Sequence, residues 1–264
     1  MLDYTLTEED LVFWRENHYL VLRNPMNGQQ VDALKGWAND LIEWPETAGK
    51  WMKYFEQSAT GGERLLCRVE NFIPFHDGIR DFICSETIYG ILAGLMQEEA
   101  VLFKEKINFK LPGGAGFGAH QDAPAFTSFG QQYHITMMVA VDDATVDNGC
   151  VEFSDAVDVY NTLPQAPGGT IDEEVEASLP WRPLEVKAGD LVFFDSYIPH
   201  RSPGNESDVS RRAMYITYNR KSEGERREDY FADKREKFPQ DCEKIEGKDY
   251  SASASLYNLG NPIK

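Results

Sequence analysis

The sequence predicts a mainly β protein with flanking helices, and two observations support this fold class. In the first hundred residues apolar side chains recur at helical spacing, whereas from residue 101 short β-rich runs alternate with Gly, Pro and Asp. Several short strands separated by turn residues are typical of an all-β sandwich or barrel. The length of 264 residues suits one domain. We divide it into a helix-rich part (1–100), a β core (101–220) and a C-terminal helix and tail (221–264).

Three helices are expected in the N-terminal part. Thr7 with Asp10 three residues later fits a capping box, so a short helix should run from there to about His18. A second helix is expected at 29–44, and Ser85 can cap a third. The apolar face of the second helix contains Val31, Leu34, Trp37, Ala38 and Leu41.

The other elements follow from β-rich runs and from Gly and Pro. The expected strands are 19–22, 65–72, 101–110, 132–142, 150–154, 184–186, 190–196 and 212–219. Asp147-Asn148-Gly149 fits a tight hairpin turn, because Asn-Gly tolerates positive φ. The Pro- and Gly-containing segments 45–64 and 155–183 are expected to be irregular loops that serve as lids. The charged segment 222–238 is expected to be a solvated helix.

Composition limits the classes of partner. The chain has 44 acidic and 26 basic residues, a formal net charge of −18, so binding to nucleic acid or to an anionic membrane is not expected. The sequence has no apolar run long enough to span a membrane and no basic leader before an apolar segment. Its 4 cysteines form no CxxC pair. We therefore expect a cytoplasmic protein with reduced thiols; the oligomeric state is not predicted.

Two of the 5 histidines lie in contexts that indicate a metal site. His120 and Asp122 are two residues apart, so on an extended segment both side chains share one face. His200 follows the apolar run that ends at Phe194. Two imidazoles and one carboxylate form the facial triad of non-haem Fe(II) oxygenases. An HxD pair alone also occurs as a capping Asp beside an ordinary His, and His76 and His134 are interpreted as structural.

Further motifs make the resemblance to a known family specific. The sequence resembles the phytanoyl-CoA dioxygenase family of Fe(II)- and 2-oxoglutarate-dependent oxygenases over roughly residues 8–220, most strongly from 103 to 220. Within it, the segments around 103–112, 120–125 and 218–220 resemble the branch of 2-aminoethylphosphonate and trimethylaminoethylphosphonate hydroxylases. The motifs, in family order, are His120-Gln121-Asp122, Asn148-Gly149, Gly189-Asp190-Leu191-Val192-Phe193-Phe194, His200 and Arg211.

The resemblance implies a fold and a metal site. The fold is a distorted double-stranded β-helix, a cupin-like jelly roll, with the N-terminal helices packed on one sheet. His120, Asp122 and His200 would bind Fe(2+). Related halogenases have Ala or Gly in place of the Asp, so Asp122 indicates oxidation rather than chlorination.

The resemblance also implies a co-substrate site. Arg211 would pair with the distal carboxylate of 2-oxoglutarate, for which a planar guanidinium is suited; its neighbour Arg212 would point to the opposite face. Ser202 and Asn108 resemble family residues that also contact 2-oxoglutarate. Thr136 could add a hydroxyl, or be an ordinary β-branched strand residue.

A row of basic residues indicates the substrate class. Lys104, Lys106 and Lys110 share one strand face with Asn108 by the period of two. If that face points inward, Lys104 and Lys106 suit an anionic substrate; if the strand lies at an edge, the lysines are solvated. Further candidates to bind substrate are Arg68, Asn71, Gln121 and Arg201. Trp51, Tyr54 and Phe55 could cage a quaternary ammonium or simply pack.

The resemblance therefore implies an Fe(II)- and 2-oxoglutarate-dependent dioxygenase, with O2 as co-substrate. It would hydroxylate an unactivated C–H bond of a small, polar, anionic metabolite such as an aminophosphonate, releasing succinate and CO2. One alternative is the same chemistry on a larger natural-product intermediate or an acyl-CoA. The other is a non-enzymatic binding protein on a cupin-like scaffold.

Overall fold

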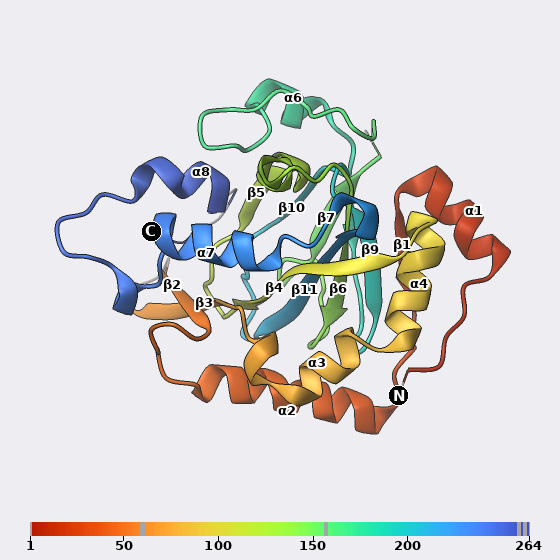
Figure 1. Ribbon diagram of the computed structural model, residues 1–264, viewed down its shortest axis with the longest axis horizontal. Helices are drawn as coiled ribbons and strands as arrows, with labels where there is room; N and C mark the ends of the chain where they lie inside the picture. Colours follow the sequence, from red (N-terminus) through yellow and green to blue (C-terminus); the bar gives the residue numbers. More distant parts are fainter. Residues whose placement is uncertain (1, 59–61, 156–157, 258–259, 261–262, 264) are drawn as a thin grey trace.

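The computed structural model describes residues 2–58, 62–155, 158–257, 260 and 263. Two antiparallel sheets face each other, with helices on the outer side of the larger sheet (Figure 1). The larger sheet has the strand order β1-β9-β6-β11-β4-β3-β2, and the smaller sheet the order β5-β10-β7-β8. The prediction of a jelly roll with flanking helices is thus confirmed.

The strands are β1 (Tyr19–Leu22), β2 (Met52–Gln57), β3 (Arg64–Glu70), β4 (Ala100–Lys110), β5 (Phe117–His120), β6 (His134–Ala140), β7 (Val151–Ser154), β8 (Trp181–Leu184), β9 (Leu191–Asp195), β10 (His200–Ser202) and β11 (Arg211–Arg220). The helices are α1 (Glu8–Asn17), α2 (Gly28–Glu43), α3 (Asp77–Ile83), α4 (Glu86–Met96), α5 (Ala123–Phe126), α6 (Glu173–Ser178), α7 (Arg227–Lys237) and α8 (Ala254–Tyr257).

Side-chain caps define the N-terminal helices, as the sequence predicts. Thr7 and Asp10 form the expected capping box at α1, and the Ser85 hydroxyl accepts a hydrogen bond from Ile88 N at α4. Asn27 and Gln30 form a second capping box that starts α2 at Gly28. The three expected helices are therefore confirmed, with bounds shifted by one or two residues.

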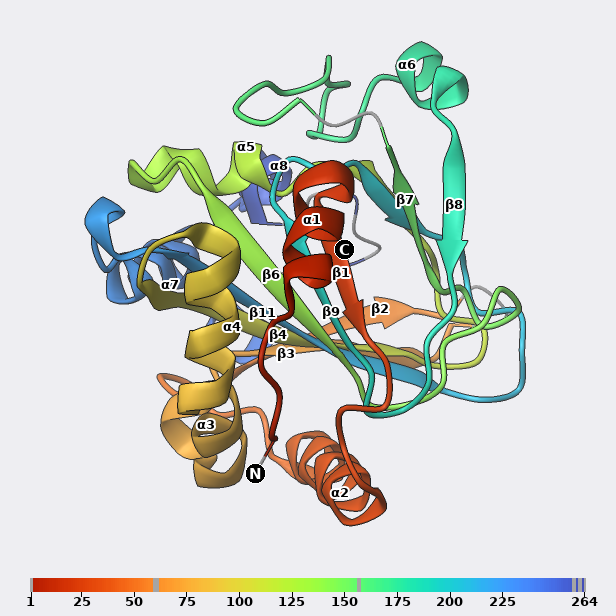
Figure 2. The same ribbon diagram turned by 90° about the vertical axis from the view of Figure 1, so that its right-hand side faces the viewer.

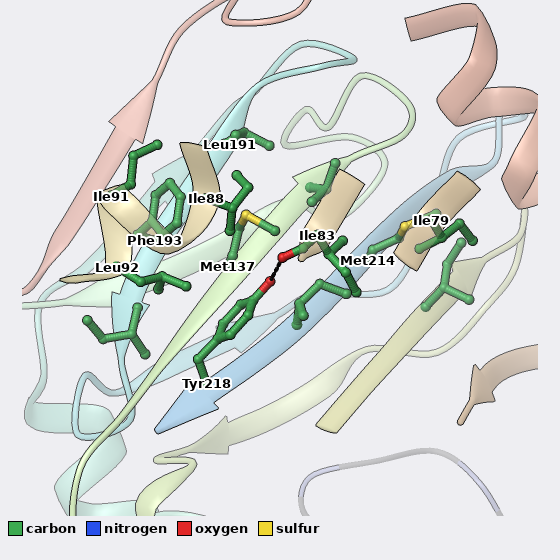
Figure 3. Close-up of a cluster of buried hydrophobic side chains, with 14 of the residues drawn as sticks. Ile79, Ile83, Ile88, Ile91, Leu92, Met137, Leu191, Phe193, Met214 and Tyr218 are labelled. Carbon is green, nitrogen blue, oxygen red and sulfur yellow. Dashed lines mark hydrogen bonds between the residues drawn. The ribbon is translucent and has the colours of Figure 1, made fainter. Parts of the chain in front are cut away.

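The helices cover the outer face of the large sheet (Figure 2). Ile83 of α3 and Leu92 of α4 pack against Met137 of β6 and Phe193 of β9 in one buried cluster (Figure 3). The Tyr218 hydroxyl donates a hydrogen bond to the carbonyl oxygen of Ile83 at 2.7 Å, which ties β11 to α3. This apolar layer makes the large sheet a rigid wall behind the site.

Three expectations about local structure are wrong. The segment 45–64 is not wholly irregular: β2 lies within it and extends the sheet by pairing with β3, whereas residues 59–61 lie outside the described part. The segment 155–183 likewise contains α6 and β8, and the strand expected at 184–186 is instead β8. The turn at Gly149 does not close a hairpin, because β6 and β7 belong to different sheets.

The C-terminal helix α7 is also not the solvated helix that its charge suggests. Tyr230, Phe231 and Lys234 of α7 are buried, and the helix contacts β4 (Figure 1).

Among the described residues, no helix is long and apolar enough to cross a membrane. The cysteines Cys67, Cys84, Cys150 and Cys242 are free thiols.

Candidate metal and co-substrate site

The proposed metal ligands come together between the two sheets. His120 ends β5, His200 begins β10, and the two residues are register partners in the antiparallel pair. One ligand atom from each of His120, Asp122 and His200 lies within 4.8 Å of the others, and all three residues are buried. Within the described part of the chain, this is the one group of three or more His, Cys, Asp or Glu so placed.

Backbone carbonyls orient both imidazoles. His120 Nδ1 lies 2.7 Å from the carbonyl oxygen of Gly118, and His200 Nδ1 lies 3.0 Å from that of Ile198. A ring whose Nδ1–H donates to a carbonyl presents Nε2 as the free ligand atom. Both rings and the carboxylate are thereby held ready for a divalent metal.

Electrostatics keeps the three ligands in the protonation states that metal binding requires. Burial, followed by the charge of His200, lowers the pKa of His120 to about 3. Burial also lowers the pKa of His200. Burial would raise the pKa of Asp122, but the neighbouring His200, Lys106 and Lys104 outweigh it and hold that pKa well below its usual range. The imidazole of His120 is therefore neutral and the carboxylate ionised at neutral pH.

A buried aspartate holds the turn that delivers His200. Asp195 Oδ1 accepts hydrogen bonds from the backbone N–H groups of Tyr197 and Ile198 at 2.7 and 3.1 Å. Its other oxygen lies 2.8 Å from His18 Nδ1. Our sequence analysis did not identify Asp195. A local signal existed, because an Asp after a strand often bonds to the backbone two residues later.

Arg211 is a buried cation with no ion-pair partner among the described residues, although its side chain lies within hydrogen-bonding reach of Tyr215. It is 1 % exposed, and its Nε and Nη2 have no hydrogen-bond acceptor among the described residues. Arg212 points to the other face, where it donates to Asp142, as strand alternation predicts. An unpaired buried cation is costly, so this position suits an anion. The expected 2-oxoglutarate fits, since its distal carboxylate can take both free nitrogens.

Two of the other co-substrate candidates border a cavity at the metal ligands. Asn108 and Ser202 line it together with the metal ligands and Tyr215. The Ser202 hydroxyl donates to the carbonyl oxygen of Gly149 at 2.8 Å and accepts a hydrogen bond from Lys110. Gly149 has φ +74°, and a Cβ there would lie 2.3 Å from the carbonyl oxygen of Pro203, so only glycine allows this packing.

Thr136 is not brought to the cavity. Its hydroxyl lies 3.0 Å from that of Thr217, because the two residues are register partners on β6 and β11. Tyr215 does border the cavity, although our sequence analysis did not name it. The alternation that turns Arg211 inward also turns Tyr215 inward, so the signal was available.

Three cationic side chains gather on the inner face of β3 and β4. Strand β4 lies between β11 and β3, so it is not an edge strand; Lys104 is buried there and Lys106 is half-buried. Neither lysine has a hydrogen bond or ion pair with another described residue; Lys104 Nζ lies 4.3 Å from the centre of the Phe126 ring. Arg68 is 2 % exposed and keeps a buried Nη2 with no acceptor among the described residues.

The mutual influence of these charges shows that they are neighbours. Burial, followed by the positive charges of Arg68 and Lys104, lowers the pKa of Lys106 to about 7. Burial also lowers the pKa of Lys104, while the charges of Asp122 and Glu70 oppose that shift. Lys104 and Lys106 thus lie near the carboxylate of Asp122, and Arg68 lies near the two lysines. We call Arg68, Lys104 and Lys106 the cationic cluster.

The remaining substrate candidates are committed to other partners. The Asn71 side chain donates to Lys50 O and accepts from Arg227, beyond the end of β3. Arg201 borders the cavity, but its guanidinium donates to Glu152 and Glu176. Both side chains are thus held by protein partners.

Of the two interpretations of Trp51, Tyr54 and Phe55, the contacts agree with packing rather than with a cage. Trp51 packs on Trp44, and Arg64 lies over Phe55. Tyr54 instead lies beside Lys234.

Gln121 links the metal-binding segment to the predicted lid. Its Nε2 donates to Tyr197 O at 2.6 Å, and its Oε1 accepts from Leu163 N at 2.7 Å. In the same lid, Tyr160 packs against Tyr197 and accepts a hydrogen bond from Arg220. Gln121 is therefore placed to hold residues 160–163 near the site rather than to contact a substrate.

Comparison with known proteins is consistent with this geometry. The family model described as phytanoyl-CoA dioxygenase (PhyH) matches residues 14–213. The chain is 60% identical over 258 residues to a 2-aminoethylphosphonate dioxygenase from an uncultured bacterium, covering 98% of each chain. It is 41% identical to a methylphosphonate hydroxylase from Gimesia maris, covering 90% of each chain.

Solved structures show the same fold. The crystal structure of EctD from S. alaskensis with 2-oxoglutarate and 5-hydroxyectoine superposes with a TM-score of 0.72 at 18% identity, covering 84% of this chain and 79% of that one. The epimerase SnoN from nogalamycin biosynthesis superposes with a TM-score of 0.65 at 19% identity, covering 81% of this chain and 82% of that chain.

Proposed function

Because the chain belongs to the phytanoyl-CoA dioxygenase family, we propose that it hydroxylates a carbon of 2-aminoethylphosphonate or of a closely related small phosphonate. The enzyme class is an Fe(II)- and 2-oxoglutarate-dependent dioxygenase. The reaction consumes the substrate C–H bond, O2 and 2-oxoglutarate and yields the alcohol, succinate and CO2. The non-enzymatic alternative finds no support in a chain whose relatives are named as dioxygenase and hydroxylase over nearly their full length.

The cationic cluster is the observation that carries the substrate proposal. It offers free donors from three side chains, Arg68, Lys104 and Lys106, beside a carboxylate that is already committed to the metal. Three donors match the three oxygens of a tetrahedral phosphonate, whereas a carboxylate has two. The protein as a whole carries −18, so this positive interior is a local feature of the site.

The protein groups divide the work of the reaction. When bound, Fe(II) and 2-oxoglutarate supply the oxidising power for insertion of one oxygen atom into a C–H bond. His120, Asp122 and His200 hold the metal on one side and leave the other side open. Arg211 anchors the co-substrate by its distal carboxylate. The cationic cluster fixes the phosphonate, so that a carbon one or two bonds away is presented to the metal.

A panel of matched compounds tests the proposal. Taurine and β-alanine keep the aminoethyl chain of 2-aminoethylphosphonate but replace the phosphonate by a singly charged tetrahedral sulfonate or a planar carboxylate. Substrate-dependent succinate formation should be fastest with 2-aminoethylphosphonate. We expect kcat/KM for the two analogues to be lower by about tenfold or more, since β-alanine loses one charge-assisted contact and the sulfonate of taurine carries less negative charge on its three oxygens. Equal turnover of β-alanine, or no stimulation by any phosphonate, would contradict the proposal.

A further inference from the structure

Lys234 is a buried lysine on an otherwise highly charged helix. It is 1 % exposed, although α7 has the sequence REDYFADKREK. Its Nζ lies 5.1 to 5.9 Å from the centres of four aromatic rings, those of Tyr54, Tyr230, Phe238 and Tyr257. Burial of a lysine is rare unless the charge is paired. The helix therefore delivers this ammonium group to a particular partner.

That partner is Glu70 on the inner face of β3. Lys234 Nζ lies 2.7 Å from both carboxylate oxygens of Glu70, which is itself 2 % exposed. Burial alone would raise the pKa of Glu70, but the charges of Lys234, Arg68 and Lys104 outweigh it and lower that pKa to about 2. Glu70 is therefore an anion at neutral pH, shared by more than one cation.

Glu70 also fixes Arg68 of the cationic cluster. Arg68 Nη1 donates to Glu70 Oε1 at 3.1 Å, and Arg68 Nε donates to Asn108 Oδ1 at 3.2 Å. Two nitrogens of the planar guanidinium are thus held, and the third, Nη2, is buried without an acceptor among the described residues. Asn108 lines the cavity of the metal ligands, so the contacts run from α7 to that cavity.

We infer that Lys234 is a positioning residue for the substrate: through Glu70 it holds Arg68 so that its free Nη2 faces the anionic head group. The carboxylate of Glu70 is shared by Lys234 and Arg68, so it does not pair with the guanidinium alone. Lys234 competes with Arg68 for Glu70, which keeps the arginine from being fully neutralised. This inference rests on the proposed function, because it assigns Arg68 to the phosphonate.

The test uses Lys234→Met, which keeps most of the stem among the rings and removes the charge. The matched control is Lys237→Met on the same helix, where the side chain is 49% exposed and pairs with Asp233. KM for 2-aminoethylphosphonate should rise about tenfold in Lys234→Met, since Glu70 then pairs with Arg68 alone and draws its guanidinium away from the substrate. KM for 2-oxoglutarate should stay within about twofold of wild type, and the control should match wild type.

The double variant Glu70→Gln/Lys234→Met covers the case in which the single variant does not fold. It removes both charges of the buried pair, which proteins tolerate better than the loss of one partner, and it leaves Arg68 a neutral amide in place of its charged anchor. The same selective rise in KM is expected.

A purely structural role would give a different kinetic result. It would lower the active fraction, and hence the apparent kcat, while leaving both KM values unchanged. That result, or an equal rise in both KM values, would overturn the inference. If wild type itself turns over no phosphonate, the proposed function fails instead.

Discussion

At the scale of single residues, the site is built from charges buried without a counter-charge. Arg211 is 1 % and Lys104 8 % exposed, and neither has an ion pair with a described residue. Such burial costs free energy, and natural proteins retain it mainly where function requires it. Bound anions would remove this cost. Substitutions at these positions should therefore separate stability from activity.

Lys104→Met should make the protein more stable and less active. The variant removes a desolvated charge and its repulsion with Lys106 and Arg68, so the free energy of unfolding should increase by about 1 kcal/mol. KM for 2-aminoethylphosphonate should rise. Thermal unfolding and succinate kinetics measure the two effects. Lys53→Met is the control. Buried Lys53 donates hydrogen bonds to the carbonyl oxygens of Ile42 and Trp44, so this variant should lower the free energy of unfolding.

Arg211 and Arg212 form a matched pair on opposite faces of β11. Arg211→Met should raise KM for 2-oxoglutarate by about a hundredfold, since two charge-assisted contacts are lost. Arg212→Met loses a partly exposed ion pair with Asp142 and should leave that KM unchanged. Initial rates at varied 2-oxoglutarate concentration decide this. A similar KM in both variants would mean that Arg211 does not hold the co-substrate.

Lys106 should give stability a defined pH dependence. Its pKa is lowered to about 7 by burial and by the charges of Arg68 and Lys104, whereas an unfolded lysine has a pKa of about 10.4. Between about pH 7 and pH 10.4, the unfolded chain binds more protons at this lysine than the folded chain does. The destabilising effect of Lys106 on the folded state therefore becomes smaller as pH rises. Urea unfolding should therefore show that Lys106→Met stabilises the protein more at pH 7 than at pH 10. An equal effect at both pH values would contradict the lowered pKa of this lysine.

At the scale of elements, local sequence signals determine what can be predicted. The capping boxes at Thr7 and Asn27 and the cap at Ser85 fix helix starts within a few residues, and the apolar runs locate the central strands. The sequence analysis missed strand β2 because its polar sequence does not indicate a strand. The strand forms because it pairs with β3. The buried face of α7 was missed for a similar reason: its charge pattern hides Lys234, whose partner lies 164 residues away.

The lid element provides a prediction at Gln121. Gln121→Leu leaves Tyr197 O and Leu163 N without their side-chain partner, which should favour opening of residues 160–163 by about fivefold. Water would then reach the site more often, so more 2-oxoglutarate should be consumed per molecule of product. The ratio of succinate to hydroxylated product measures this. The exposed Gln132→Leu serves as control; an unchanged ratio in Gln121→Leu would show that this link does not close the site.

At the scale of the whole molecule, the two sheets contribute different parts of the site. The small sheet and the turn that follows its strand β5 supply the proposed metal ligands, and the large sheet supplies Arg211 and the cationic cluster. The helices behind the large sheet keep it rigid. The proposed substrate site thus lies where the two sheets face each other, inside a protein with a net charge of −18.

The whole-molecule view also explains which parts of the site were predictable. His120 and Asp122 are near neighbours in sequence, and strand alternation from Lys104 places Lys106 and Asn108 on one face. Glu70 and Lys234 carry no such local signal, because their meeting depends on how α7 packs on β3 and β4. Thr136 was expected at the co-substrate, but the register with Thr217 takes its hydroxyl elsewhere.

The most direct test of the account is the stoichiometry of the reaction with 2-aminoethylphosphonate. Purified enzyme would be supplied with Fe(II), 2-oxoglutarate and air, and the phosphorus-containing species followed by ³¹P NMR while succinate is measured in parallel. We predict one new phosphonate resonance, formed in step with succinate, and neither product in His200→Ala. Succinate formation with the 2-aminoethylphosphonate resonance unchanged would contradict the assignment of this site to a phosphonate.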